Sequence, residues 1–210
     1  MNLEHEKKPP SLTREHILQA AGRQVMSEGA SGLTLEAVAK NAGISKGGLL
    51  YHFPSKEALI LGMIDAHFEW IKQVILEEKS RLPHPEAPGA WHRAFVEASF
   101  KNFVACNDLS AGMLAVVSQD SMLAGRIQQG LRELGAVRAG DGIPPVVSNL
   151  VVSTLDGIKI HQVVGMPMLS EQEAGDLRNL LFRLIDEGVQ ACAIPAKTHR
   201  APPPNQRESA

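Results

Sequence analysis

Apolar residues recur every three to four positions along most of this chain, which is the spacing of amphipathic helices. The first such stripe contains Ile17, Leu18, Ala21 and Val25. Alternating runs of β-branched residues, which are typical of half-buried strands, are missing from the sequence. The pattern therefore predicts an all-α fold.

Hydroxyl residues mark the expected helix starts in the N-terminal quarter. Thr13, Thr34 and Ser45 each follow a leucine or isoleucine and precede a helical stripe, and Ser55 precedes the next long stripe. A hydroxyl at this place caps the first turn, and the apolar residue before it packs back on the helix. Gly43 ends the second helix after about two turns. A short helix, a turn and another short helix form the helix-turn-helix pattern.

The rest of the chain predicts longer helices. Residues 82–89 (LPHPEAPG) are a linker by composition. A helix that starts at Pro144 or Pro145 is apolar on almost every side and should be buried. Ser170 and Glu173 form a capping box for an amphipathic last helix. The expected helices cover residues 91–104, 113–134 (as one or two helices), 144–166 and 171–189.

Composition excludes several protein classes. Hydrophobic residues make up 44% and charged residues 21% of the 210 residues, as in a globular protein. Apolar runs are far shorter than the roughly 20 residues that span a bilayer, so no membrane segment is expected. No secretory signal is expected at the N-terminus. Cys106 and Cys192 are far apart, which favours a reducing cytoplasm over a disulfide scaffold.

The segment 44–59 (ISKGGLLYHFPSKEAL) carries the candidate DNA-binding chemistry. Residues 1–56 hold seven Lys and Arg against five Glu, although the whole chain has a net charge of −2. A recognition helix presents its N-terminal residues to DNA. The Ser45 hydroxyl can meet a phosphate, and the Lys46 ammonium can meet a phosphate or guanine O6/N7.

Other residues of this segment offer contacts to the DNA backbone. Gly47 and Gly48 lack side chains, so the helix backbone can approach another molecule closely. Tyr51 and His52 can donate to phosphate oxygens, and Lys56 adds a positive charge at the start of the next helix. Each residue alone has a structural explanation, such as a solvated lysine or a glycine turn. Their ordered combination favours DNA binding.

The ordered motifs resemble the signature of the TetR family of bacterial transcriptional regulators. They are residues 34–39 (TLEAVA), 42–47 (AGISKG), 50–53 (LYHF) and 56–59 (KEAL), within a similarity that covers roughly residues 13–60. The resemblance implies a three-helix DNA-binding head, a connecting fourth helix, and a C-terminal helical domain that binds a small effector and dimerises. The DNA contacts that it implies are Thr34, Ser45, Lys46, Gly47, Tyr51, His52 and Lys56, with Gly48 and Leu49 at positions that often help to read sequence.

This resemblance gives the expected domain division. The parts are a flexible arm (1–10), the helix-turn-helix domain (11–55, motif at about 34–53), the connecting helix (56–81), the effector-binding and dimerisation domain (82–194) and a disordered tail (195–210). The homodimer contact is expected within residues 144–191. The leucines from Leu177 to Leu184 can either cover the protomer's own core or pack against a second subunit.

An effector pocket should be apolar with a few polar groups. Its candidate residues are Phe95, Phe103, Met113, Met122, Asp156 and His161. Packing in the core explains the aromatic residues and methionines equally well. Asp156 lies in an otherwise apolar helix and requires a partner, which is Lys159, a hydroxyl such as Thr154, or an effector.

Enzyme chemistry is disfavoured. Residues 43–47 match the GxSxG pattern of hydrolases, but a helix rather than a strand precedes the serine. No two histidines have zinc-ligand spacing, so no metal, cofactor or catalytic residue is expected. The sequence predicts a repressor that leaves its double-stranded DNA operator when a small molecule binds. The alternatives are an activator, an effector-independent DNA binder and, least favoured, a small helical enzyme.

Overall fold

The computed structural model describes residues 10–29, 32–102, 121–163, 166 and 168–193. Within these ranges every regular element is a helix, which confirms the expected all-α fold. The helices are α1 (Pro10–Glu28), α2 (Leu35–Asn41), α3 (Lys46–His52), α4 (Lys56–Ser80), α5 (Ala90–Asn102), α7 (Ser121–Ala139), α8 (Pro145–Val163) and α9 (Glu171–Ala193).

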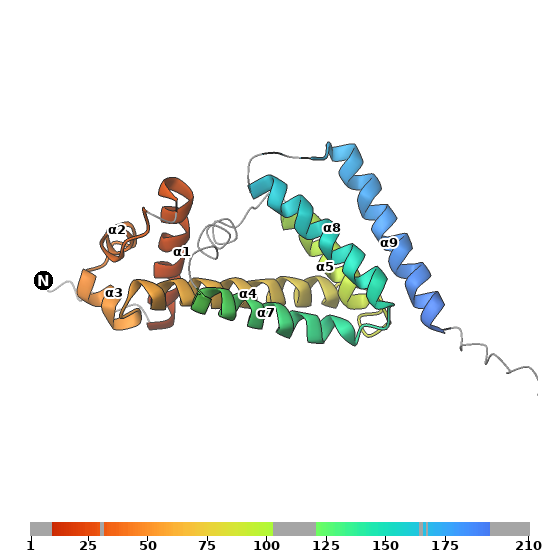
Figure 1. Cartoon of the computed structure of the whole chain (residues 1–210), viewed down its shortest axis with the longest axis horizontal. Helices are drawn as coiled ribbons and strands as arrows, with labels where there is room; N and C mark the ends of the chain where they lie inside the picture. The colour runs from red at the N-terminus through yellow and green to blue at the C-terminus, as the bar shows by residue number, and fades with distance from the viewer. Residues whose placement is uncertain (1–9, 30–31, 103–120, 164–165, 167, 194–210) are drawn as a thin grey trace, which may run out of the picture.

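The three N-terminal helices form a small head at one end of the long helix α4 (Figure 1). Fully buried aliphatic side chains from all of these elements meet in one core, among them Ile17, Leu33, Leu49, Leu59 and Ile64. Helix α4 leaves the head and continues into the C-terminal helices. It is therefore the continuous element that joins the two parts.

Side-chain caps begin three of these helices as expected. The hydroxyls of Thr34, Ser45 and Ser55 accept hydrogen bonds from the backbone N–H three residues later, at 3.1, 3.0 and 3.1 Å. The expectation for the first helix is wrong, because α1 begins at Pro10 rather than after Thr13. A proline fits the first turn, where its missing N–H would have no partner within the helix.

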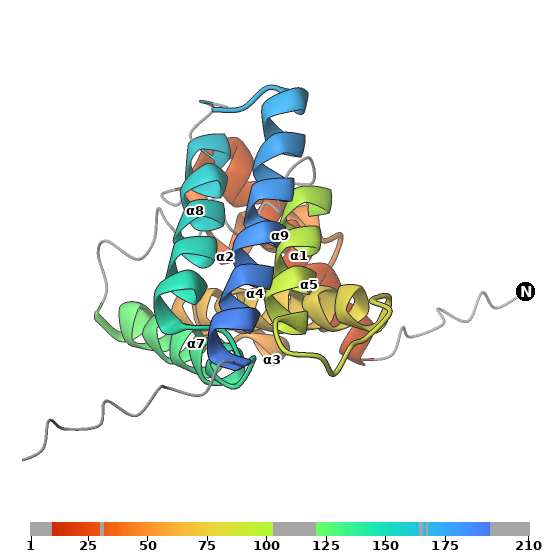
Figure 2. The same cartoon turned by 90° about the vertical axis from the view of Figure 1, so that its right-hand side faces the viewer.

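Helices α5, α8 and α9 pack beside one another at the far end of α4, and α7 lies along α4 (Figures 1 and 2). Helix α8 begins at Pro145, as the sequence predicts, but it is not buried on all sides within the protomer. Val151, Leu155 and Ile158 point into the core, whereas Val146 is 74% exposed and Leu150 is 50% exposed. The second apolar face therefore has no cover within the described chain.

The expected linker 82–89 ends inside the C-terminal core. Gly89 is buried with a φ of 81°, and its N–H donates to the carbonyl of Asp141 at 2.6 Å. The Asp141 carboxylate accepts from the N–H groups of Trp91 and His92 at 2.9 and 3.0 Å, so it caps α5. The same carboxylate lies 2.6 Å from His92 Nδ1, and His92 Nε2 lies 2.8 Å from the Ser148 hydroxyl. This network joins the starts of α5 and α8.

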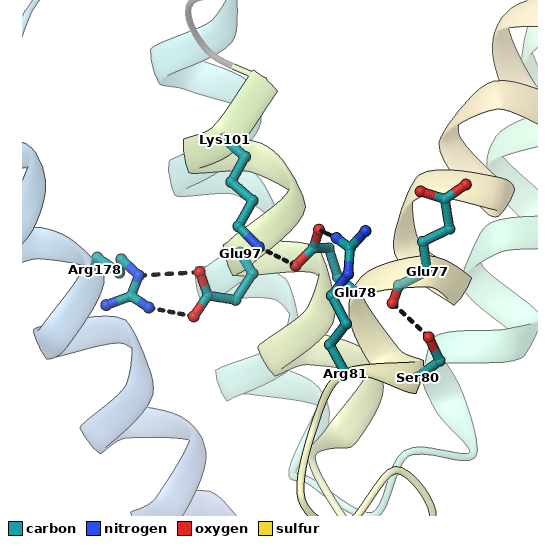
Figure 3. A network of polar contacts seen from close by, with 7 residues as sticks. All are labelled: Glu77, Glu78, Ser80, Arg81, Glu97, Lys101 and Arg178. Atoms are coloured by element: carbon teal, nitrogen blue, oxygen red, sulfur yellow. Dashed lines mark hydrogen bonds and ion pairs between the residues drawn. The ribbon is translucent and has the colours of Figure 1, made fainter.

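Ion pairs join α5 to the helices on both sides of it (Figure 3). Glu78, near the end of α4, is almost buried and pairs with both Arg81 and Lys101. On the other side of α5, Glu97 pairs with Arg178 of α9. The C-terminal end of α4 is thereby fixed to the α5–α9 pair.

The contact between α4 and α7 is a third connection. Arg126 of α7 donates to Asp65 at 2.6 Å, and Lys72 pairs with Glu133 at 3.3 Å. Between these two pairs the Phe68 ring lies against Gly130, where an added Cβ would lie 2.6 Å from Cζ of that ring. A larger residue at this position is incompatible with the observed packing.

None of the described helices is long and apolar enough to cross a membrane.

Candidate nucleic-acid interface

Gly43 forms the tight turn between α2 and α3. Its φ is 63°, a conformation that residues with a side chain rarely adopt. The N–H of Gly43 donates to the carbonyl of Lys40, and the N–H of Ile44 donates to that of Ala39. The turn therefore fixes the angle between the two short helices before any DNA is present.

Helix α3 has one buried and one exposed face. Leu49 is 0% exposed and belongs to the core of the head, whereas Tyr51 is 82% exposed. The sequence resemblance places Leu49 among the positions that often help to read sequence. Its side chain packs in the core of the head, and a part of this position in reading DNA stays a prediction.

Two glycines in the first turn of α3 leave its backbone without side chains of their own. Ser45 uses its hydroxyl to cap α3, and the helix then continues through Gly47 and Gly48. A Cβ at Gly47 would find the Ser45 hydroxyl as its nearest neighbour, at 4.0 Å, and a Cβ at Gly48 would find it at 3.3 Å. Gly47 is exposed and leaves room for another molecule to approach the first turn of α3, whereas a side chain at Gly48 would crowd the Ser45 cap.

Lys46 has a partner that the sequence reasoning missed. Its ammonium pairs with the carboxylate of Glu36, which lies in the first turn of α2. Both side chains are mostly exposed, at 55% and 64%. The hydrogen bond and charge of Lys46 lower the pKa of Glu36, together with the backbone at the start of α2. The only sign of this contact in the sequence is that Glu36 lies in the first turn of one helix and Lys46 begins the next helix.

The remaining candidates lie around α3. Thr34 is exposed at the start of α2, and Lys56 is half-buried at the start of α4. His52 is half-buried and lies edge-on to the Tyr51 ring, with centroids 5.1 Å apart. The structure therefore gathers these candidates on α3 and at the starts of its two neighbouring helices.

Two further residues hold α3 against α4. Phe53, which follows α3, packs so close to Gly62 of α4 that an added Cβ would lie 2.5 Å from the ring. The Arg14 guanidinium covers the same ring at 5.1 Å from its centroid. Neither residue was a candidate from sequence. They set the orientation in which α4 carries the head.

The effector candidates are not gathered in the same way. Phe95 is half-buried and stacks on Trp91, with centroids 5.2 Å apart, within the C-terminal cores. Met122 is exposed at the start of α7. Phe103 and Met113 lie outside the described residues. The expectation of a shared pocket therefore remains a prediction.

Asp156 and His161 lie on α8. Asp156 is exposed, yet desolvation by nearby protein raises its pKa while Lys159 and Arg138 act in the opposite direction. The Lys159 ammonium lies 5.9 Å from the centre of the Trp70 ring. His161 Nδ1 lies 2.8 Å from the Gly157 carbonyl in its own helix. That contact gives His161 a structural partner.

Comparison with known proteins decides the family. Residues 17–63 match the model of the bacterial regulatory proteins of the tetR family, and residues 89–186 match the tetracyclin repressor-like C-terminal domain. The chain belongs to the TetR family. The family resemblance drawn from residues 34–59 is therefore confirmed, and the GxSxG pattern at 43–47 is part of a helix-turn-helix. Members of this family are DNA-binding regulators rather than enzymes.

Similar proteins come from several organisms. The nucleoid occlusion factor SlmA of Vibrio atlanticus is 40% identical over 77 residues, which cover 34% of this chain and 39% of that factor. The SlmA of a Marinomonas species is 26% identical over 166 residues, covering 71% of this chain and 82% of the factor. Among solved structures, the multidrug binding protein EbrR with malachite green has a TM-score of 0.62 at 23% identity, covering 81% of this chain and 96% of that one. A TetR regulator from Haloarcula marismortui reaches 0.67 at 18% identity, covering 85% and 98%.

Proposed function

We propose that this TetR-family chain is a ligand-responsive transcriptional repressor that binds operator DNA as a homodimer in the cytoplasm. The observation that carries the proposal is the exposed front of α3, where Ser45, Lys46 and Tyr51 surround an open glycine backbone. Two such helices, about 34 Å apart in a dimer, can enter successive major grooves. Residues 11–55 are the DNA-binding domain in this proposal.

Sequence reading by this head depends on few side chains. Gly47 and Gly48 have no side chain, and that of Leu49 is buried. Direct base contacts are then limited to the start of α3 and to Tyr51. We expect DNA shape and backbone contacts to supply much of the specificity.

The homodimer is proposed to form through the outer faces of α8 and α9, which lie together at one end of the molecule (Figure 2). Exposed apolar side chains on these helices support this placement. They are Val146, Leu150 and Ile160 on α8 and Leu180 on α9. A second copy that covers them removes apolar surface from water.

The same structure changes the choice of residues for testing the dimer. Leu181 is only 1% exposed and packs in the protomer's own core, so a charge there unfolds the protomer instead of splitting a dimer. Leu150→Glu places the charge on the outer face. We expect sedimentation of this variant to show folded monomers with weak operator binding. A folded, fully dimeric Leu150→Glu protein would move the interface elsewhere.

The effector is proposed to be a small molecule that binds in the C-terminal part, near the candidates Phe95, Met122, Asp156 and His161. Support comes from EbrR, a protein with the same fold whose structure contains malachite green. An effector shifts the population toward a head spacing that does not fit the operator. Since α4 is the continuous element between the two parts, it is the expected route of coupling.

DNA binding tests the main proposal. The duplex is the region upstream of the gene, compared with an unrelated duplex of equal length. Wild-type protein should prefer the upstream region, and Lys56→Gln should weaken binding to both duplexes and flatten the salt dependence by about one unit for each half-site. A protein that binds neither duplex between 50 and 200 mM salt contradicts the proposal.

A second candidate is an effector-independent DNA binder that acts on the chromosome as a whole. The observation that favours it is the similarity to nucleoid occlusion factors. Mapping the bound sites across the chromosome separates the two functions. A repressor occupies one or a few promoters, whereas a nucleoid factor occupies many sites and is not released by any of a panel of small molecules that includes malachite green.

A further inference from the structure

The contact between Glu36 and Lys46 crosses the helix-turn-helix. Glu36 belongs to α2 and Lys46 is the first residue of α3, ten positions later in the chain. Lys46 is also the cation that the head offers to DNA at the start of α3. In the free head this cation is therefore already paired with a carboxylate.

The carboxylate of Glu36 contacts the Lys46 ammonium in the way that a phosphate oxygen would. Both groups are oxygen anions that accept a charge-assisted hydrogen bond from a lysine. The side chains of Glu36 and Lys46 are 64% and 55% exposed, so an anion from solution can reach the same ammonium. Glu36 is ionised at neutral pH, and the contact with Lys46 lowers its pKa further.

We propose that Glu36 competes with a DNA phosphate for Lys46 and thereby lowers the affinity of the free head for DNA. This inference rests on the proposed DNA-binding function. On binding, the Lys46 ammonium leaves the Glu36 carboxylate and contacts a phosphate oxygen. The free energy gained from the phosphate contact is therefore reduced by the loss of the contact with Glu36. The remaining negative charge of Glu36 also faces the DNA backbone. Both effects reduce binding to any sequence, because phosphates are present in every sequence.

The expected effect is moderate, because exposed ion pairs are weak. Their usual strength corresponds to about two- to five-fold in an equilibrium constant. Removing the competition with Glu36→Gln should therefore tighten DNA binding about two- to five-fold for each half-site, and by roughly four- to twenty-five-fold for a dimer. The gain should shrink as salt rises, since salt screens an exposed ion pair.

A double-mutant cycle on the full-length protein tests whether Glu36 acts through Lys46. Binding of wild type, Glu36→Gln, Lys46→Gln and the double variant is measured by fluorescence anisotropy on the upstream duplex and on the unrelated duplex. Glu36→Gln should tighten binding to both duplexes. In the Lys46→Gln background the same change should have a clearly smaller effect, because no ion pair is left to release.

Glu15→Gln is the matched control. Glu15 is exposed on α1 and its carboxylate accepts a hydrogen bond from Gln19, so this change removes the same charge from the head without touching Lys46. A gain from Glu15→Gln as large as that from Glu36→Gln means that only the net charge of the head matters, and it overturns the inference. Thermal melting of each variant confirms that the head is folded.

The other outcomes are equally decisive. Weaker binding by Glu36→Gln shows that Glu36 positions Lys46 for DNA instead of competing with it. A gain confined to the upstream duplex shows that Lys46 reads a base, and unchanged binding shows that the ion pair has no effect. Each of these results overturns the inference. If wild-type protein binds neither duplex, the proposed function itself fails, which is a separate result.

Discussion

The head and the C-terminal helices are both all-α, but the polar contacts that organise them have different ranges. In the head, Thr34, Ser45 and Ser55 each cap a helix by reaching only three residues along the chain. In the C-terminal part, Asp141 caps α5 across 50 residues, and Arg178 reaches Glu97 across 81 residues. The starts of α2, α3 and α4 are thus encoded locally, whereas the start of α5 depends on the finished fold. Within the C-terminal part α9 is the exception, because the predicted capping box of Ser170 and Glu173 is present.

This difference agrees with the functions that we propose for the two parts. The head must present the same α3 surface to DNA in every state, and local caps hold it together while it moves. The C-terminal helices must respond to a ligand, and contacts between distant segments can change together when helices shift. Removing one long-range contact in the C-terminal part should therefore destabilise a wide region. Removing one cap in the head should destabilise only the helix that it begins.

The largest expected effect comes from Asp141. Asp141→Ala removes the acceptor for two N–H groups at the start of α5 and for His92, whose side chain is fully buried. Buried groups without partners cost about 1–3 kcal/mol each, so we expect a loss of about 3 kcal/mol or more in the free energy of unfolding. Urea unfolding at fixed protein concentration measures it.

Two further variants calibrate this result. Asp141→Asn keeps one acceptor oxygen and should cost less than Asp141→Ala. Glu77→Ala removes an exposed carboxylate from α4 and should stay within about 0.5 kcal/mol of wild type. If Asp141→Ala is no more destabilising than Glu77→Ala, long-range capping does not organise the C-terminal part.

Gly130 tests the packing of α7 against α4. Gly130→Ala brings a methyl group against the Phe68 ring, which is 3% exposed, and should destabilise the protein by about 1–3 kcal/mol. Phe68→Leu in the same chain should restore part of that loss. The urea midpoint gives the stability, and DNA affinity shows whether the tilt of α4 has changed.

Helix α7 provides its own controls for this prediction. An added Cβ at Gly125 or Gly135 would meet nothing within 4 Å. Alanine at either position should therefore stabilise the protein by up to about 1 kcal/mol, through the better helix propensity of alanine. Replacing glycine by alanine is therefore expected to lower stability at Gly130 and to raise it at Gly125 and Gly135 of the same helix. Equal effects at all three positions would show that Phe68 can move aside.

The sequence predicted the head more completely than the rest of the chain, for a physical reason. The caps at Thr34, Ser45 and Ser55 depend on the next few residues, so the sequence contains the whole signal. The error at α1 has the same origin, because Thr13 resembles a cap but Pro10 can start the helix earlier.

Contacts between distant residues leave no such local signal. Nothing near Asp141 in the sequence indicates that it caps α5. For Glu36 the sequence shows only its place in the first turn of a helix, which does not identify Lys46 as its partner. The full burial of the Leu49 side chain follows from the folded head, and the expected part of this position in reading DNA stays a prediction. The sequence predicts apolar side chains on almost every side of α8, but only the folded protomer shows that the side with Val146 and Leu150 has no cover within the described chain.

His67 should make stability depend on pH. Burial, together with the charge of Lys159, lowers the pKa of His67 to about 3 in the folded protein, from an ordinary value of 6.5. Between these values the unfolded chain binds the proton more readily, so stability falls as pH falls below about 6.5. The slope contributed by this one group is at most about 1.4 kcal/mol per pH unit.

Urea unfolding at pH 7, 6 and 5 measures this dependence. His67→Leu removes the titrating group while keeping an apolar side chain against Phe68, so its stability should change less between pH 7 and 5. His84→Leu is the control, because His84 is exposed in the turn after α4. A pH dependence that is identical in wild type and His67→Leu would show that His67 is protonated readily in the folded protein.

The smallest expected effect concerns Ser45, which is proposed both to cap α3 and to contact a phosphate. Ser45→Ala removes the hydroxyl that accepts from Gly48 and should cost about 1 kcal/mol of stability. Ser45→Asp keeps a good cap, since aspartate is a favoured residue at helix starts, but it adds a negative charge where the phosphate should lie. Ser45→Asp should therefore melt close to wild type and bind DNA more weakly than Ser45→Ala. Thr34→Ala and Thr34→Asp repeat the comparison at the start of α2. If Ser45→Asp binds DNA at least as well as Ser45→Ala, no phosphate approaches the start of α3, and Ser45 is a cap alone.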